Sequence, residues 1–138
     1  MKTFCIIKPD AISRGLVGAI ITRLEEADFQ ILYLQMRWKN SDWCRKMYGH
    51  LTGVVYDAQE EFMTNAPLIG IILDGVGIIE RARRIVGATD STQATPGTIR
   101  GDFGSQPIRC NCVHASDNID SVAKEIELFF NTETDKND

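Results

Sequence analysis

The sequence alternates short apolar segments with longer segments in which apolar residues recur at helical spacing. The segment PLIGIIL, residues 67–73, is almost wholly apolar, which is typical of a central strand. A strand is predicted over residues 31–38 because apolar residues alternate there, and another over 3–8 because this apolar segment stops at Pro9. Residues 108–114 are the last predicted strand.

Helices are predicted between these strands. Apolar residues between 16 and 27 form one stripe of a helix. Ser41 is the predicted N-cap of a short helix that runs to Tyr48. A third helix is predicted over residues 75–84, with Gly87 as its C-terminal stop.

Other segments have weaker patterns. For residues 51–63 we expect a loop followed by a helical turn at 58–63. Residues 88–106 are rich in Thr, Gly, Ser and Pro, and long loops of this kind are usually functional or disordered. Asp117 is predicted to cap a last helix that ends near Phe130, and residues 131–138 form a polar tail that we expect to fray.

This order of elements predicts an α/β (α+β) fold. Two helix–strand units in succession give βαββαβ, a ferredoxin-like arrangement with a four-stranded antiparallel sheet and helices packed on one face. The sequence has no internal repeat and no linker-like boundary. We therefore expect residues 1–138 to form a single domain.

Composition excludes several classes of protein. With 138 residues, 43% hydrophobic and 25% charged, the chain has the make-up of a soluble globular domain, and no run is long and apolar enough to span a membrane. The first residues fit a strand better than a signal peptide, so we expect a cytoplasmic protein whose four cysteines stay reduced. The net charge of −4 argues against dedicated nucleic-acid binding but permits a small anionic ligand.

The segment CNCVHASD, residues 110–117, raises the question of a metal or redox site. Strand periodicity would place Cys110, Cys112 and His114 on one face. A structural zinc site needs about four ligands, however, and no second cluster supplies the rest. The spacing C-x-C also differs from the redox motif C-x-x-C. Small strand residues are the favoured interpretation of both cysteines.

Glycine motifs for nucleotides are weak or missing. The phosphate-binding pattern G-x-x-x-x-G-K-[ST] does not occur. The segment LDGVGIIE contains G-x-G between a predicted strand and helix, but Glu80 stands where a dinucleotide-binding fingerprint has its third glycine. A turn that begins the helix is therefore favoured over a dinucleotide oxidoreductase.

Cationic residues fall near the ends of the predicted elements. Lys8 ends a strand, Arg83 and Arg84 end a helix, and Arg100 lies in the long loop, where Thr89 can add a hydroxyl donor. Arginine presents a planar fork that matches phosphate oxygens. If these residues converge, they could bind a triphosphate with its Mg²⁺.

His114 is a candidate nucleophile. It ends a predicted strand, and Glu125 on the last helix could turn back toward it. A carboxylate bonded to one imidazole nitrogen fixes the tautomer and makes the other nitrogen a better nucleophile. This combination suggests a phosphohistidine, although a lone histidine is more often a satisfied structural residue.

The chain resembles the nucleoside diphosphate kinases. The matching segments are IIKPDAISRGLVGAII, PGTIRGDF, and NCVHASD followed by AKEI, and the resemblance covers nearly the whole chain. It implies a ping-pong transfer of the γ-phosphate from a nucleoside triphosphate, usually ATP, to a nucleoside diphosphate. It also implies Mg²⁺ held through the nucleotide phosphates, and a homo-oligomer, hexamer or tetramer, built from dimers. A binding module that keeps the fold without catalysis is the alternative.

The resemblance also implies roles for individual residues. His114 takes the phosphoryl group, Glu125 orients the His114 ring, and Ser116 assists Glu125. The phosphates are contacted by Lys8, Arg83, Thr89 and Arg100, with Tyr48 beside the phosphoryl group and Asn111 at the sugar hydroxyl.

Part of the chain departs from the family pattern. Residues 49–66 match poorly and are one residue short, so the residue that stacks on the nucleobase falls at Val55 or Tyr56. We favour Tyr56, because an aromatic ring can still stack. The segment GSQPIRC is one residue longer than usual.

Overall fold

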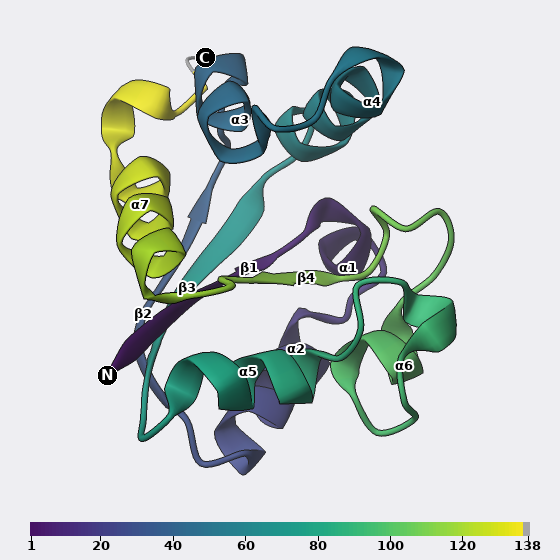
Figure 1. Cartoon of the computed structure of the whole chain (residues 1–138), viewed down its shortest axis with the longest axis vertical. Helices are drawn as coiled ribbons and strands as arrows, with labels where there is room; N and C mark the ends of the chain where they lie inside the picture. Colours follow the sequence, from purple (N-terminus) through teal and green to yellow (C-terminus); the bar gives the residue numbers. More distant parts are fainter. Residues whose placement is uncertain (137–138) are drawn as a thin grey trace.

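The protein, a computed structural model that describes residues 1–136, is built on a four-stranded antiparallel sheet with strand order β2-β3-β1-β4 (Figure 1). The strands are β1 (Lys2–Ile7), β2 (Gln30–Arg37), β3 (Leu68–Asp74) and β4 (Val113–Ala115). The ferredoxin-like prediction is confirmed. The segment predicted over 67–73 is a central strand, as its apolar sequence indicated.

The two central strands are buried along almost their whole length. In β1 every residue after Lys2 is buried, and in β3 every residue before Asp74. Because successive side chains of a strand point to opposite faces, both faces of this sheet need a covering layer.

Helices cover both faces, so the expectation of helices on one face was wrong. Figure 1 shows α2 (Val17–Glu26), α5 (Ile78–Val86) and α6 (Ile99–Phe103) below the sheet. The opposite face carries α3 (Ser41–Tyr48), α4 (Gly53–Thr64) and α7 (Ile119–Phe130).

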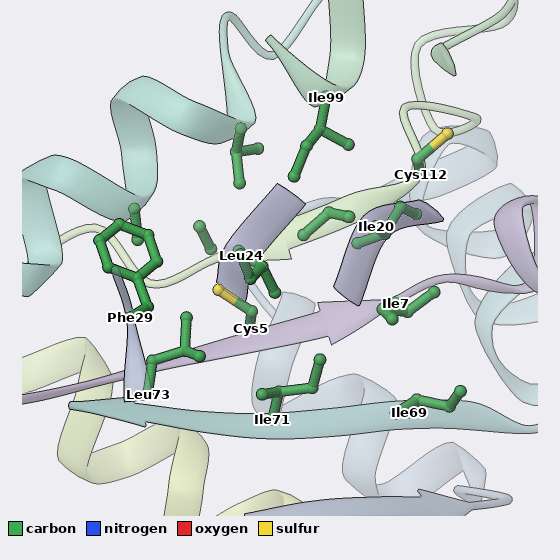
Figure 2. Close-up of a cluster of buried hydrophobic side chains, with 14 of the residues drawn as sticks. Cys5, Ile7, Ile20, Leu24, Phe29, Ile69, Ile71, Leu73, Ile99 and Cys112 are labelled. Atoms are coloured by element: carbon green, nitrogen blue, oxygen red, sulfur yellow. The ribbon is translucent and has the colours of Figure 1, made fainter. Parts of the chain in front are cut away.

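Each layer has its own apolar core. On the α2 and α5 side, Cys5 and Ile71 of the sheet pack with Leu24 and Ile99 (Figure 2). On the other side Phe4 and Ile6 pack with side chains from the facing helices, among them Trp43, Met63 and Phe129. Alternate residues of β1 thus belong to different cores, as the period of a strand requires.

Two helices begin with a different cap from the predicted one. Asn40, not Ser41, caps α3, and its side chain accepts a hydrogen bond from the Trp43 backbone N–H. Asn118, not Asp117, caps α7 through the Ser121 N–H. In both cases the Asn has extended backbone geometry, which a capping residue needs. Gly87 ends α5 as predicted.

Three helical segments differ from the prediction. Residues Pro9–Ser13 form α1, whose first position suits proline because no helical partner exists there for its missing N–H. Helix α4 has twelve residues where only a turn at 58–63 was expected. The predicted loop over 88–106 contains α6 and the short 3₁₀ helix η1 (Ser91–Gln93).

Strand β4 is shorter than predicted. Of the segment 108–114, only Val113 and His114 lie in β4, because the backbone of Cys112 is left-handed (φ 73°) and cannot continue a strand. Cys110, Cys112 and His114 therefore do not share a strand face. All four cysteines are free thiols.

The end of the chain is packed, not frayed, over residues 131–136. Thr134 in the 3₁₀ helix η2 (Thr132–Thr134) is buried, and its carbonyl accepts from the Asn40 N–H. Asp135 forms ion pairs with Arg37 and with the fully buried Lys39. The rest of the predicted tail, residues 137–138, lies outside the described residues. Within the described chain, no helix has the length and apolar character needed to cross a membrane.

Candidate active site

A cleft of about 1030 Å³ opens beside β4 between α4, the start of α7 and the segment that precedes β4. Most of the residues predicted to form the site line it, although they come from distant parts of the sequence. They are Lys8, Tyr48, Arg83, Thr89, Arg100, Asn111, His114 and Glu125. The convergence of cationic residues, which the sequence left open, is thus present, except that Arg84 does not line the cleft.

His114 is held by a carboxylate. Its Nε2 lies 2.5 Å from Glu125 Oε1 on α7, and both side chains are mostly buried, with exposed fractions of 20% and 13%. A neutral imidazole carries one N–H, so an Nε2–H that donates to Glu125 leaves a lone pair on Nδ1. In this tautomer Nδ1 is the ring nitrogen with a lone pair available to a ligand in the cleft.

Ser116 supports the carboxylate from below. Its side chain is fully buried, and its hydroxyl lies 2.8 Å from the same Glu125 oxygen and 3.2 Å from the Phe4 carbonyl oxygen. The Glu125 carboxylate, held by both His114 and Ser116, cannot rotate freely. Ser116 therefore contacts Glu125, the partner of His114, and does not itself line the cleft.

Lys8 lies at the end of β1 and faces the base of the cleft. Its Nζ donates to Asn111 Oδ1 at 2.9 Å, and the Asn111 amide donates to the Thr89 carbonyl at 2.8 Å. Burial lowers the pKa of Lys8 to about 8, and the nearby charge of Arg100 adds to the effect. A cation with no carboxylate ion pair in the described chain is expensive to bury unless an anion compensates.

Two arginines extend the positive charge. The Arg100 guanidinium donates to the carbonyls of Gly87 (2.9 Å) and Val113 (2.6 Å), while burial lowers its pKa to about 10. Backbone carbonyls orient Arg100 but leave its charge unneutralised. Arg83 is about half exposed and forms an ion pair with Asp117. The sequence had indicated Asp117 only as a helix cap.

Tyr48 brings a buried hydroxyl to the cleft. Its Oη has no hydrogen-bond partner among residues 1–136, and burial raises the pKa of the phenol. The group therefore stays protonated at neutral pH. Because a buried unpaired donor costs about 1–3 kcal/mol, the hydroxyl is suited to donate to a ligand that enters the cleft.

Tyr56, the residue favoured for stacking on the nucleobase, is not among the residues that line the cleft. Its hydroxyl donates to Glu60 Oε1 at 3.1 Å, and its ring packs against the core beneath α4. The alternative residue, Val55, does line the cleft and is 59% exposed. Successive residues of a helix point about 100° apart, and here that rotation turns Val55 toward the cleft and Tyr56 toward the core.

Several cleft residues were missed by the sequence analysis. The apolar ones include Leu51, Val54 and Pro107, and the polar ones are His50, Gln59, Gln106, Arg109, Asp117, Ser121 and Lys124. Lys124 adjoins Glu125 and could have been inferred from it. Val54 of α4 could not, because its segment was predicted as a loop.

Comparisons with known proteins agree with this geometry. The family model for nucleoside diphosphate kinase matches residues 1–134. The nucleoside diphosphate kinase of Pyrococcus horikoshii is 41% identical over 135 residues, which cover 96% of this chain and 86% of the relative.

Solved structures of nucleoside diphosphate kinases have the same fold. One from Borrelia burgdorferi, a transition-state mimic with bound vanadate and ADP, superposes with a TM-score of 0.87 at 30% identity and covers 100% of this chain and 91% of its own. Another from Halobacterium salinarum, in complex with CDP, has a TM-score of 0.89 at 32% identity and covers 99% and 91%. Since family model, sequence relatives and fold agree over nearly its whole length, this chain belongs to the nucleoside diphosphate kinase family.

Proposed function

We propose that this chain transfers the γ-phosphate of a nucleoside triphosphate, ATP foremost, to a nucleoside diphosphate through a phosphohistidine on His114. The observation that carries the proposal is the pairing of His114 Nε2 with Glu125 beside a cleft lined by unneutralised cations. A nucleophilic nitrogen and phosphate-binding charges are the two requirements of this chemistry.

In the first half-reaction the Nδ1 lone pair of His114 attacks the γ-phosphorus. The P–N bond forms as the bond from phosphorus to the β-γ bridging oxygen breaks, and the electron pair leaves with the nucleoside diphosphate. The ring gains positive character, which the Glu125 carboxylate stabilises through the Nε2–H. In the second half-reaction a terminal oxygen of the acceptor diphosphate attacks the same phosphorus, and the electron pair of the P–N bond returns to Nδ1.

The cations hold the phosphates in line with His114. We assign Lys8, Arg83 and Arg100 to charge stabilisation, with hydroxyl donation from Thr89 and Tyr48. Asn111, which already bridges Lys8 and the Thr89 carbonyl, is assigned to the sugar hydroxyl. The nucleobase is left to the apolar part of the cleft around Val55.

We propose Mg²⁺ as the metal, bound through the phosphate oxygens of the nucleotide and water. In residues 1–136 no group of three or more His, Cys, Asp or Glu side chains is placed to hold a metal ion. Mg²⁺ commonly binds by way of substrate phosphates, so the cleft fits a metal that arrives with its nucleotide. When bound, it offsets phosphate charge that the protein cations leave uncompensated.

The proposed partner is a second copy of the chain. Strand β2 is an edge strand, and its exposed apolar side chains include Tyr33 (57%) and Met36 (56%). Such an edge is protected when it pairs with another chain. We propose a homo-oligomer of single-domain subunits, hexamer or tetramer, built from a dimer along β2 and located in the cytoplasm. Light scattering with a β2 variant, Met36→Lys, checks the interface, because a charge there should weaken the dimer.

The function is tested by labelling with γ-³²P ATP and Mg²⁺ in the absence of an acceptor. The wild type should acquire an acid-labile, base-stable label that a nucleoside diphosphate removes. His114→Asn should bind nucleotide without labelling. Nucleotide binding with no label on the wild type would instead indicate a binding module, and a label that persists in His114→Asn would move the nucleophile elsewhere.

A further inference from the structure

The two ends of the cleft differ chemically. One end carries the cations around His114, and the other is lined by Leu51, Val54, Val55, Pro107 and Ile108. A nucleotide has the same polarity, with charged phosphates at one end and a flat, largely apolar base at the other. The inference below rests on the proposed function and concerns the base end.

Arg109 lies at this apolar end. It follows Ile108 directly, lines the cleft and is exposed. Its guanidinium carbon is 6.0 Å from the centroid of the Phe62 ring on α4. Arg109 therefore reaches from the segment before β4 toward α4, which provides the other wall of the cleft.

The charge of Arg109 is not engaged elsewhere. Among the described residues it forms no ion pair, and no hydrogen bond of its side chain is present, in contrast to Arg83 and Arg100. At 6.0 Å the contact with Phe62 is at the outer limit of a cation–π interaction, so the guanidinium can turn toward a ligand at little cost.

We propose that Arg109 is a specificity-determining residue that donates hydrogen bonds to the edge of the nucleobase and selects guanine over adenine. Arginine offers N–H donors and no acceptor. Guanine presents two acceptors, O6 and N7, on the edge that arginine binds in a bidentate manner, whereas adenine presents a donor, the N6 amino group, in place of O6.

The walls of the apolar end of the cleft make the contact of Arg109 with the base edge more important for selectivity. Val55 (59% exposed) and Ile108 (50% exposed) are aliphatic. An aliphatic wall gains from burial of the base but has no ring quadrupole with which to favour one purine over the other. Discrimination between purines is then left to polar groups at the edge.

Other polar cleft residues are less selective. Gln59 and Gln106 carry amides, which have both a donor and an acceptor and so can serve either base. Lys124, the neighbour of Glu125 on α7, belongs to the reacting end of the cleft. Arg109 is the donor-only side chain that adjoins the aliphatic wall.

The experiment uses the ³²P-labelled phosphoenzyme, purified from nucleotide, and measures the second-order rate of label transfer to GDP, IDP and ADP with Mg²⁺. For the wild type we expect transfer to GDP to be about 5- to 10-fold faster than transfer to ADP. This ratio is at the low end of the discrimination that an arginine–guanine pair provides, because the site is partly exposed. IDP should follow GDP, because it retains O6 and lacks only the 2-amino group.

Arg109→Ala should bring the GDP-to-ADP ratio close to one, while Arg109→Lys should keep part of the preference. Arg84→Ala is the matched control, since Arg84 is an exposed arginine outside the cleft, and its ratio should equal that of the wild type. The ratio is internal to each variant, so a general loss of folded protein leaves it unchanged.

Three results would overturn the proposal: a wild-type ratio below twofold, an unchanged ratio in Arg109→Ala, or IDP that behaves like ADP. Failure of the proposed function is distinguished by the first step, because the protein would then take up no label at all.

Discussion

Gly70 of β3 is a position where a single methyl group should damage both stability and catalysis. A Cβ on Gly70 would lie 2.3, 2.5 and 2.8 Å from three atoms of the Phe129 ring, whereas ordinary contacts begin near 3.4 Å. The ring would therefore have to move by about 1 Å, the difference between 3.4 and 2.3 Å. Its centroid is already 5.5 Å from that of Phe4 and 5.2 Å from that of Phe130, which leaves little room for such a shift.

Overpacking of this kind typically costs about 1–3 kcal/mol, and each disturbed aromatic pair adds about 0.5–1.5 kcal/mol. We expect Gly70→Ala to lower the free energy of unfolding by about 3 kcal/mol. Phe129 and Glu125 are four residues apart on α7 and so share one face of the helix. A displaced Phe129 should therefore move Glu125 away from His114 and slow phosphohistidine formation.

The assay is urea unfolding at one protomer concentration, combined with the rate of ³²P uptake. A double-mutant cycle with Phe129→Leu isolates the clash, because the smaller side chain should relieve part of the cost of the Gly70→Ala substitution. Gly18→Ala is the control: a Cβ there meets no atom within 4 Å, and alanine in the first turn of helix α2 should leave stability unchanged or raise it by less than about 1 kcal/mol. The reasoning is refuted if Gly70→Ala unfolds within about 0.5 kcal/mol of the wild type, or if its effect is additive with that of Phe129→Leu.

Three further predictions follow from the site and the C-terminal contacts. Burial lowers the pKa of Lys8 to about 8, so kcat/KM should fall as pH rises through 8, because Lys8 then loses its positive charge. Between pH 8 and the ordinary pKa of 10.5, Lys8 is protonated in the unfolded chain but not in the folded protein, so its contribution makes the free energy of unfolding rise with pH. A pH–rate profile that stays flat to about pH 9 would contradict this assignment. Glu125→Gln replaces the charge-assisted hydrogen bond to His114, worth about 1.5–3 kcal/mol, by a neutral one. Phosphorylation should then be slower by roughly 10- to 100-fold in a rapid-quench assay, and equal rates in the variant and the wild type would refute this role. Asp135→Asn removes the charge that faces the fully buried Lys39 and should lower the free energy of unfolding in urea by about 1.5–3 kcal/mol. The control, Asp42→Asn, removes one partner of an exposed ion pair with Arg45 and should lower it by less than about 0.5 kcal/mol. Equal effects of the two substitutions would argue that burial of the Lys39 charge does not matter.

The polar residues of the site could be predicted because they occur in short contiguous motifs. PGTIRGDF carries Arg100, and NCVHASD carries Asn111 and His114 together. The first motif is ordered locally by the Thr98 cap of α6, and the second is held as a unit by the pairing of β4 with β1. Position in the motif therefore fixes position in the cleft.

The wall of the cleft that α4 forms could not be predicted because it depends on the rotation of one helix. In α4 the apolar and polar residues do not form a clear stripe, so its period was hidden. Once the helix starts at Gly53, Val55 faces the cleft and Tyr56 the core. An error of one residue in the alignment is an error of about 100° in direction.

The other failures have non-local causes. Nothing in the sequence around Cys112 indicates a left-handed backbone, which is uncommon outside glycine and Asn or Asp. Its N–H is bonded by Asp10 Oδ2, a residue from the other end of the chain. The ordered C-terminus likewise depends on Lys39, whose Nζ contacts the carbonyl oxygens of Phe129 and Asn131 as well as Asp135.

Strand order explains why a cation near the N-terminus and a histidine near the C-terminus form one site. β1 pairs with β4 in antiparallel register, with Ile7 opposite Val113 and Ile6 opposite His114. Lys8, the next residue after β1, must therefore emerge at the edge of the sheet where β4 begins, and its N–H bonds the Cys112 carbonyl there at 2.9 Å. The helical crossover that returns the chain to β4 also carries Arg83 and Arg100, so the same topology brings the remaining charges to that edge. A change that shifted the β1–β4 register by one residue would turn His114 to the opposite face, away from Glu125, and would abolish the nucleophile without removing any catalytic side chain.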